Sequence, residues 1–153
     1  MEFKFIRWPI RKLIDVIDNG KIDLKPSFQR NFIWSPTEQK QLIDSIVNSY
    51  YPLPTFFIFQ SDYDYYIMVD AQQRSRSTYL FHKGDLTDSY KNKIRDVNKD
   101  DFYGYPLNIS LITGLDKNDS LEAFYSLVNK TGKRLNIPEL YKAQYHGKKF
   151  YSL

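Results

Sequence analysis

The chain has 153 residues, of which 42% are hydrophobic and 26% charged, and its formal net charge is +4. These values are typical of one globular domain, exclude a disordered chain, and permit an anionic partner such as DNA, RNA or a nucleotide. The absence of cysteine excludes disulfides, thiolate zinc sites and a cysteine nucleophile. No apolar run approaches the roughly 20 residues of a membrane helix, and the N-terminal segment lacks the apolar core of a signal peptide. We therefore expect a cytoplasmic protein with no membrane partner.

The N-terminal part of the chain predicts one helix and a loop. Apolar residues recur at helical spacing over residues 9–18, with a proline in the first turn and Gly20 as the stop signal. Residues 21–24 then read as a short extended piece. The polar and aromatic stretch 26–34 follows as a loop.

The sequence signals for secondary structure are stronger between residues 35 and 70. A helix is predicted over residues 35–48, because Ser35 and Glu38 have the spacing of a capping box around a proline. Two strands are predicted over residues 55–60 and 65–70, joined by a polar turn.

The second half of the chain alternates in the same way. The predicted elements are a helix over 72–82, an irregular charged region over 84–105 with a short helix near 88–95, a strand over 106–112, a helix from Asp119, a loop over 129–136 and a last helix from Asn136. Together these elements predict a single α+β domain over residues 1–153, with a small mixed sheet and flanking helices.

A dense polar cluster stands where the strand over 65–70 passes into the next helix. Its residues are Asp70, Ala71, Gln72, Gln73 and Arg74. Backbone N–H groups at a helix start attract phosphate, guanidinium groups bind phosphate in a bidentate manner, and an aspartate can hold a metal ion or a water. The composition fits equally well a solvated turn in which the aspartate merely caps the helix. No glycine-rich phosphate loop is present.

Two further polar clusters precede and follow this one. Gln29 and Arg30 lie between aromatic residues in the loop before the capped helix, where they line a site or merely belong to an ordered loop. Asn129, Thr131 and Gly132 suit a tight turn, and a plain helix-to-helix connection is the better interpretation there.

Four segments in this order resemble the N-terminal domain of GmrSD-type restriction enzymes. They are FQRNFIWSPTEQKQLIDSI, YPLPTFFIF, VDAQQRSRSTYLF and LVNKTGKRLNIPELYKAQYHG, and the resemblance runs from about residue 5 to residue 150. It implies a ParB/sulfiredoxin-like fold. It also implies nucleotide binding and hydrolysis, which in the family control a nuclease domain later in the chain.

The resemblance assigns roles to individual residues through the family signature Asp-Gly-Gln-Gln-Arg. The implied catalytic residues are Asp70, Gln72, Gln73 and Arg74, with Asp70 also the ligand of Mg²⁺ beside a nucleoside triphosphate. The implied nucleotide-binding residues are Gln29, Arg30, Arg74, Arg76, Thr78, Asn129, Thr131 and Gly132.

Two departures from the family pattern matter. Ala71 replaces the glycine of the signature, which strains the backbone if that position has a positive φ and is harmless if it is the first helical residue. The chain also stops where family members continue into a helical region and often an HNH nuclease. With only His82 and His146 present, no HNH constellation exists. We therefore expect either a fragment or a protein whose nuclease or effector is a separate chain.

The expected function is nucleotide binding, with hydrolysis as an option, in a DNA-targeting restriction or phage-defence system. DNA and a second copy of the chain are further candidate partners. The alternative is a module of the same fold that binds nucleic acid or protein without hydrolysis, with phosphates contacted by lysine and arginine side chains such as Lys83, Lys91 and Arg95. A nuclease that uses Asp44 and Asp70 as metal ligands is the weakest reading, because Asp44 fits a surface or cap-bonding role better.

Overall fold

The computed structural model describes residues 1–25 and 34–134. The chain forms two compact units, Met1–Asn118 and Asp119–Leu153, and each is treated by itself. The first unit contains β1 (Glu2–Pro9), α1 (Ile10–Asp18), β2 (Ile22–Asp23), α2 (Pro36–Val47), β3 (Phe56–Asp62), β4 (Tyr65–Asp70), α3 (Gln72–His82), a 3₁₀ turn (Ile94–Asp96), α4 (Lys99–Tyr103) and β5 (Pro106–Gly114). The described part of the second unit contains α5 (Leu121–Arg134).

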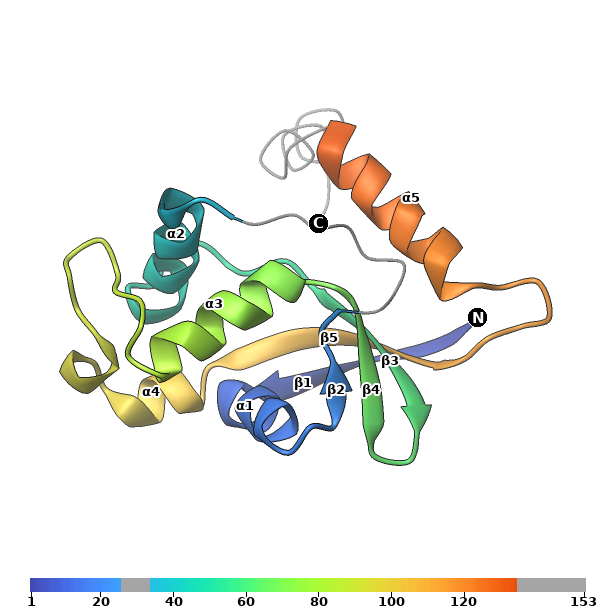
Figure 1. The fold of residues 1–153 in the computed structure, drawn as a ribbon, viewed down its shortest axis with the longest axis horizontal. Helices are drawn as coiled ribbons and strands as arrows, with labels where there is room; N and C mark the ends of the chain where they lie inside the picture. Colours follow the sequence, from blue (N-terminus) through green and yellow to red (C-terminus); the bar gives the residue numbers. More distant parts are fainter. Residues whose placement is uncertain (26–33, 135–153) are drawn as a thin grey trace. The chain divides into compact units, whose positions relative to one another are not determined.

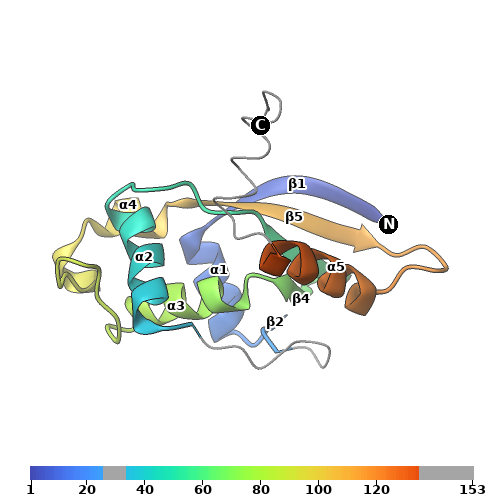
Figure 2. The same ribbon diagram turned by 90° about the horizontal axis from the view of Figure 1, so that it is seen from above.

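Five strands form one mixed sheet in the order β1-β5-β3-β4-β2 (Figure 1). The β1–β5 and β3–β4 pairs are antiparallel, whereas β5–β3 and β4–β2 are parallel. Helix α2 lies beside α3 in both views (Figures 1 and 2). The predicted α+β class with a small mixed sheet and flanking helices is confirmed.

One face of the sheet packs on the helices to form the core. Strand residues alternate between faces, so Trp8 of β1, Ile109 of β5 and Ile58 of β3 point to this side. The largest fully buried side chains are Phe56, Phe81, Phe102, Ile10, Leu13, Ile43, Ile58, Met68, Leu107, Ile109 and Ile112. Burial of such side chains is the main stabilising contribution to the fold.

Strand β1 is absent from the sequence predictions. Its apolar residues fall on both faces, with Phe3 and Phe5 on one and Ile6 and Trp8 on the other, which hides the two-residue period. The predicted helix over 9–18 is confirmed from Ile10 onward, and the preceding proline is its N-cap rather than part of its first turn.

The predicted helix over 35–48 and its capping box are confirmed. The Ser35 hydroxyl accepts the Glu38 N–H at 3.2 Å, and the Glu38 carboxylate accepts the Ser35 N–H at 2.9 Å. This box satisfies two of the N–H groups that a helix start leaves unpaired.

Two local predictions are wrong. The short helix near residues 88–95 is replaced by the 3₁₀ turn and α4 further along the chain. The loop predicted over 129–136 is helical as far as Arg134, so Asn129, Thr131 and Gly132 lie in the last turns of α5 and not in a tight turn. The helix predicted from Asn136 lies outside the described residues.

Buried carboxylates hold the irregular region onto α2. Asp44 accepts the Ser89 N–H at 2.9 Å and also the Ser89 hydroxyl, while Asn48 donates to Asp44 at 3.1 Å. Asp88 accepts the N–H groups of Tyr90 and Asn92 at 2.9 Å and 2.8 Å. Asp44 is therefore a buried hydrogen-bonding residue rather than a surface one, and both of its carboxylate oxygens accept hydrogen bonds.

Candidate functional site

The polar cluster lies at the junction of β4 and α3, as the sequence predicts. β4 ends at Asp70, which pairs with Phe57 of β3, and α3 begins at Gln72. Ala71 between them is the N-cap residue and has no side chain able to accept a hydrogen bond. Ala71 therefore offers no capping side chain to the first N–H groups of α3, and N–H groups at a helix start are a favourable place for an anion.

Ala71 adopts a left-handed conformation, with φ of 103° and ψ of 27°. The reading in which Ala71 is a harmless first helical residue is therefore wrong. An L-residue in this region carries strain of about 1–2 kcal/mol, which glycine avoids. Since the methyl group is buried, the packing around it holds the conformation in place.

The Arg74 guanidinium joins the first turn of α3 to the start of β3. Nη1 donates to the Pro54 carbonyl at 2.5 Å, and both Nη atoms lie 3.4 Å from the Thr55 carbonyl. Its centre stands 4.6 Å from the centroid of the Phe56 ring. Nη2 also lies 3.5 Å from the Asp70 carboxylate. Because only 9% of Arg74 is exposed, this side chain is chiefly a clamp between the two elements.

Burial raises the pKa of the Asp70 carboxyl, although the charge of Arg74 and the N–H of Ala71 act in the opposite direction. The free-energy cost of desolvating the carboxylate therefore exceeds the stabilisation that it receives from Arg74 and Ala71. A carboxyl with a raised pKa beside a helix start is typical of functional sites as well as of buried ion pairs.

The two glutamines have different surroundings. The Gln72 amide is buried and donates to the Met68 and Val69 carbonyls at 2.7 Å and 3.2 Å, which ties it to the end of β4. The Gln73 carbonyl oxygen accepts the Trp34 N–H at 3.3 Å. Gln73 therefore connects the start of α3 to the chain just before α2.

Comparison with protein families identifies the relationship. The model of the GmrSD restriction endonuclease N-terminal domain matches residues 10–146. The chain belongs to this family. It is accordingly a region of a restriction-type phage-defence protein. Neither the curated proteins nor the solved structures contain a match, so the ParB/sulfiredoxin-like fold stays a prediction. No described helix is long and apolar enough to cross a membrane.

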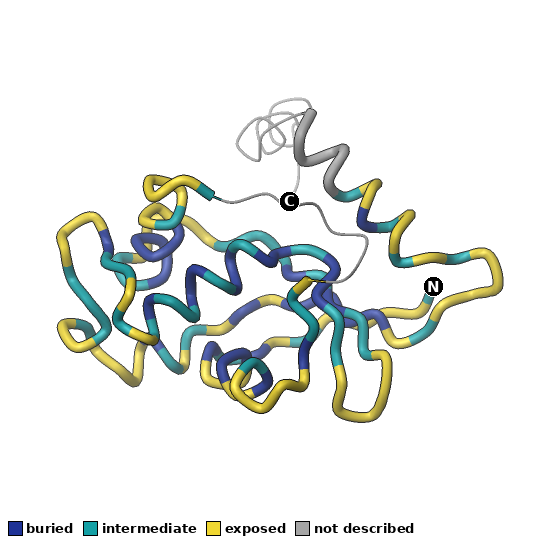
Figure 3. The backbone as a smooth tube through the Cα atoms, in the orientation of Figure 1, coloured by how far each residue is buried: buried dark blue, intermediate teal, exposed yellow. Residues whose placement is uncertain are grey.

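In this GmrSD N-terminal domain, α3 is polar in sequence and yet has no exposed residue (Figure 3). Thr78 is fully buried, and its hydroxyl donates to the Arg74 carbonyl at 2.8 Å within the helix. Arg76 is half-buried, and its Nε atom has no hydrogen bond. The hydroxyl groups of Ser75 and Ser77 are in the same situation. The sequence signal for this buried polar helix is the group of small hydroxyl residues on either side of Arg76, which are Ser75, Ser77 and Thr78.

The remaining predicted site residues lie outside the described part of the first unit. Gln29 and Arg30 lie outside the described residues. Asn129, Thr131 and Gly132 belong to the second unit of the GmrSD domain. Within residues 1–25 and 34–134, no group of three histidine, aspartate or glutamate side chains is placed to hold a metal ion.

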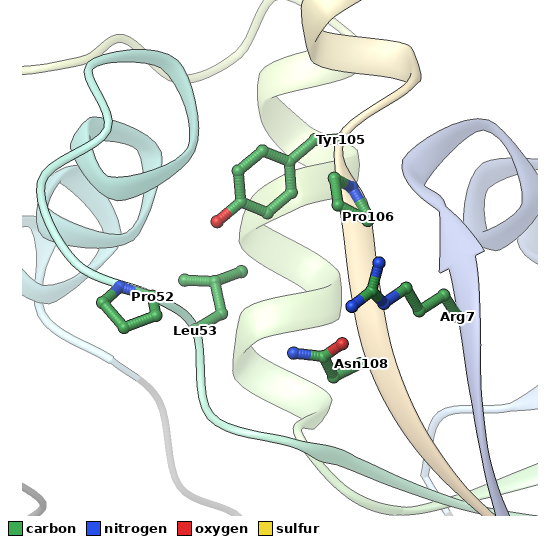
Figure 4. A pocket seen from close by; sticks show the side chains of 6 residues that line it. All are labelled: Arg7, Pro52, Leu53, Tyr105, Pro106 and Asn108. Atoms are coloured by element: carbon green, nitrogen blue, oxygen red, sulfur yellow. The ribbon is translucent and has the colours of Figure 1, made fainter.

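A pocket that the sequence does not predict lies elsewhere in the first unit (Figure 4). It has a volume of about 250 Å³ and is lined by Arg7, Pro52, Leu53, Tyr105, Pro106 and Asn108. None of the signature residues lines it. The pocket and the signature are linked along the sequence. Pro52 and Leu53 line the pocket, and the next two residues, Pro54 and Thr55, accept hydrogen bonds from Arg74.

Proposed function

We propose that the junction of β4 and α3 binds a nucleoside triphosphate with Mg²⁺, and that the chain is the nucleotide-binding and hydrolysing region of its restriction-type system. A nuclease or effector would respond to the bound nucleotide. The observation that carries the proposal is the start of α3, where Asp70 and Arg74 meet at 3.5 Å beside N–H groups that Ala71 cannot cap. The phosphates would lie on these N–H groups and on the positive end of the helix dipole.

The side chains at the junction have distinct roles in this proposal. Asp70 would bind magnesium or orient the attacking water, and Gln73 would position it. Arg74 would act through the chain segment that it clamps, because most of its donors bind Pro54, Thr55 and Asp70. The family resemblance supplies the remaining candidates, which are Gln29, Arg30, Gln72, Arg76, Thr78, Asn129, Thr131 and Gly132.

A thermal-shift panel tests the proposal. ATP, GTP, CTP and UTP at millimolar concentration, each with and without magnesium, should include at least one that raises Tm by several degrees. Asp70→Asn and Gln73→Ala should remove the shift. Asp88→Asn is the matched control, because it changes a second buried aspartate away from the junction and should keep the shift. No shift with any nucleotide would contradict nucleotide binding, and a shift without phosphate release would contradict hydrolysis.

The Ala71 geometry favours a second candidate, a module that binds nucleic acid or protein without hydrolysis. The methyl group at this left-handed position stands where the family signature has glycine, next to the proposed phosphates. In this case Ala71→Gly should restore phosphate release. Duplex DNA should then bind the unchanged protein with an affinity that falls steeply as salt rises. DNA binding that ignores salt would count against it.

A further inference from the structure

The outer face of β1 carries a row of side chains that the proposed nucleotide site does not use. Alternation along the strand places Phe3, Phe5 and Arg7 on the face opposite Ile6 and Trp8, which join the core. The register pairs Arg7 with Asn108 of β5, so this amide lies on the same face. We call Phe3, Phe5, Arg7 and Asn108 the β1 strip.

The aromatic end of the β1 strip is open. Phe3 is 55% exposed and Phe5 is 76% exposed, and their ring centroids lie 5.6 Å apart in an edge-to-face arrangement. The strand holds alternate side chains about 6.6 Å apart, so the two rings are presented at a fixed spacing. Two adjacent exposed phenylalanines on an edge strand favour aggregation unless a partner covers them, which makes them a candidate contact surface.

The other end of the β1 strip is the pocket of Figure 4. The Arg7 guanidinium and the Asn108 amide extend from the sheet toward the space that Tyr105 and Leu53 border from the other side. The described structure contains no hydrogen bond or ion pair of the Arg7, Asn108 or Tyr105 side chains. Burial raises the pKa of the Tyr105 hydroxyl, so it keeps its proton and can donate at neutral pH.

The chemistry along the β1 strip suits one class of polymer. Exposed aromatic rings stack on nucleobases, a guanidinium binds a phosphate through two parallel hydrogen bonds, and an amide pairs with a base edge. A pocket of about 250 Å³ with an apolar side of proline and leucine can admit a single base. In a duplex the faces of the bases already stack on one another, so the two phenylalanine rings can stack only on the bases of an unpaired strand.

We propose that the β1 strip binds single-stranded nucleic acid, with bases on Phe3 and Phe5 and a phosphate on Arg7 at the mouth of the pocket. The net charge of +4 supports association with such a polyanion. This site is separate from the β4–α3 junction and does not rest on nucleotide binding there.

Fluorescence anisotropy with a labelled oligothymidine of about 12 nucleotides tests the proposal. The unchanged protein should bind it more tightly than a duplex of equal length, and binding should weaken between about 50 mM and 200 mM salt. Phe5→Ala and Arg7→Ala should each weaken binding at least about five-fold without lowering Tm. Asp70→Asn should bind as the unchanged protein does, which separates this test from that of the nucleotide site.

Two matched variants serve as controls. Tyr63→Ala removes an aromatic side chain that is 90% exposed at the β3–β4 turn, and Lys40→Ala removes the charge of an exposed lysine on α2. Both should leave the affinity for oligothymidine unchanged. Equal affinity of all four variants would overturn the proposal. It would also be overturned if sedimentation showed a dimer that Phe5→Ala dissociates while oligothymidine fails to bind, because the strip would then be an interface between copies.

Discussion

Substitutions of Ala71 test whether the packing around the strand-to-helix junction holds its backbone in the left-handed conformation. Replacement by glycine removes about 1–2 kcal/mol of left-handed strain, but it also loses a buried methyl worth about 0.8 kcal/mol and adds backbone entropy to the unfolded chain. We therefore expect Ala71→Gly to stay within about 1 kcal/mol of the unchanged protein in urea denaturation. Ala71→Val should lose more than about 2 kcal/mol, because a β-branched residue tolerates a positive φ poorly. A valine variant of full stability would contradict the observed φ.

Asp70 is expected to lower stability at neutral pH. Its folded-state pKa is raised above the unfolded value, so the native state binds more protons and is penalised once the carboxyl ionises. Without nucleotide and magnesium, Asp70→Asn should therefore match or exceed the unchanged protein in free energy of unfolding at pH 7. The difference should shrink as the pH falls below about 3.9, where both states are protonated. Urea denaturation across this range measures it.

The pKa of Asp88 is shifted in the opposite direction to that of Asp70, so Asp88 is expected to stabilise the protein at neutral pH. Burial alone would raise its pKa, but hydrogen bonds from Asn92, Asn48 and Tyr90 outweigh burial and lower it. Its contribution to stability is present above the unfolded pKa of about 3.9 and disappears as the pH falls through the lower folded value. Asp88→Asn should cost about 1–3 kcal/mol at pH 7, since its amide would face N–H donors. Equal effects of the two aspartate variants would contradict at least one of the two assignments.

At the scale of elements, local signals explain what the sequence could predict. The capping box of α2 and the apolar runs of β3 and β4 are encoded in neighbouring residues, and they are confirmed. Strand β1 and the region between α3 and β5 depend on distant partners, such as β5 for the first and Asp44 for the second. The loop predicted before Arg134 was wrong because turn-forming residues there continue a helix.

The candidate site was predictable in place but not in geometry. The signature located the junction of β4 and α3, since a strand run ends there and a helical run begins. Nothing local indicated that Arg74 would turn back to Pro54 and Thr55, or that the Gln72 amide would bind the end of β4. The pocket at Arg7 escaped prediction for the same reason, because its residues come from β1, the chain before β3, and β5.

The clamp between α3 and β3 yields a prediction at this scale. Arg74→Lys keeps the charge, but one ammonium group cannot reproduce the planar contacts with Pro54, Thr55 and Asp70. We expect a loss of about 1–3 kcal/mol in urea denaturation. Arg76→Lys is the matched control, because the Nε atom of Arg76 has no hydrogen bond, and it should change stability by less than about 0.5 kcal/mol. Equal losses would show that the helix, rather than the clamp, is sensitive to lysine.

At the scale of the whole molecule, the chain combines a unit that contains the sheet with a second unit whose described part contains α5. The described core cluster, from Trp8 to Leu111, lies entirely within Met1–Asn118. The signature residues Asp70 to Arg74 and the β1 strip lie in this unit too. The family match continues to residue 146, so the second unit belongs to what the family shares.

A fragment of residues 1–118 separates these contributions. Because it keeps the core cluster and all five strands, we expect it to fold cooperatively, with a sheet-containing circular dichroism spectrum and a single thermal transition. It should also keep the oligothymidine affinity of the full chain, since the β1 strip is intact. If Asn129, Thr131 and Gly132 complete the nucleotide site, the fragment should lose the nucleotide-dependent rise in Tm. An unfolded fragment would instead show that residues 1–153 form one inseparable domain, whereas a folded fragment that still responds to nucleotide would confine the site to the β4–α3 junction.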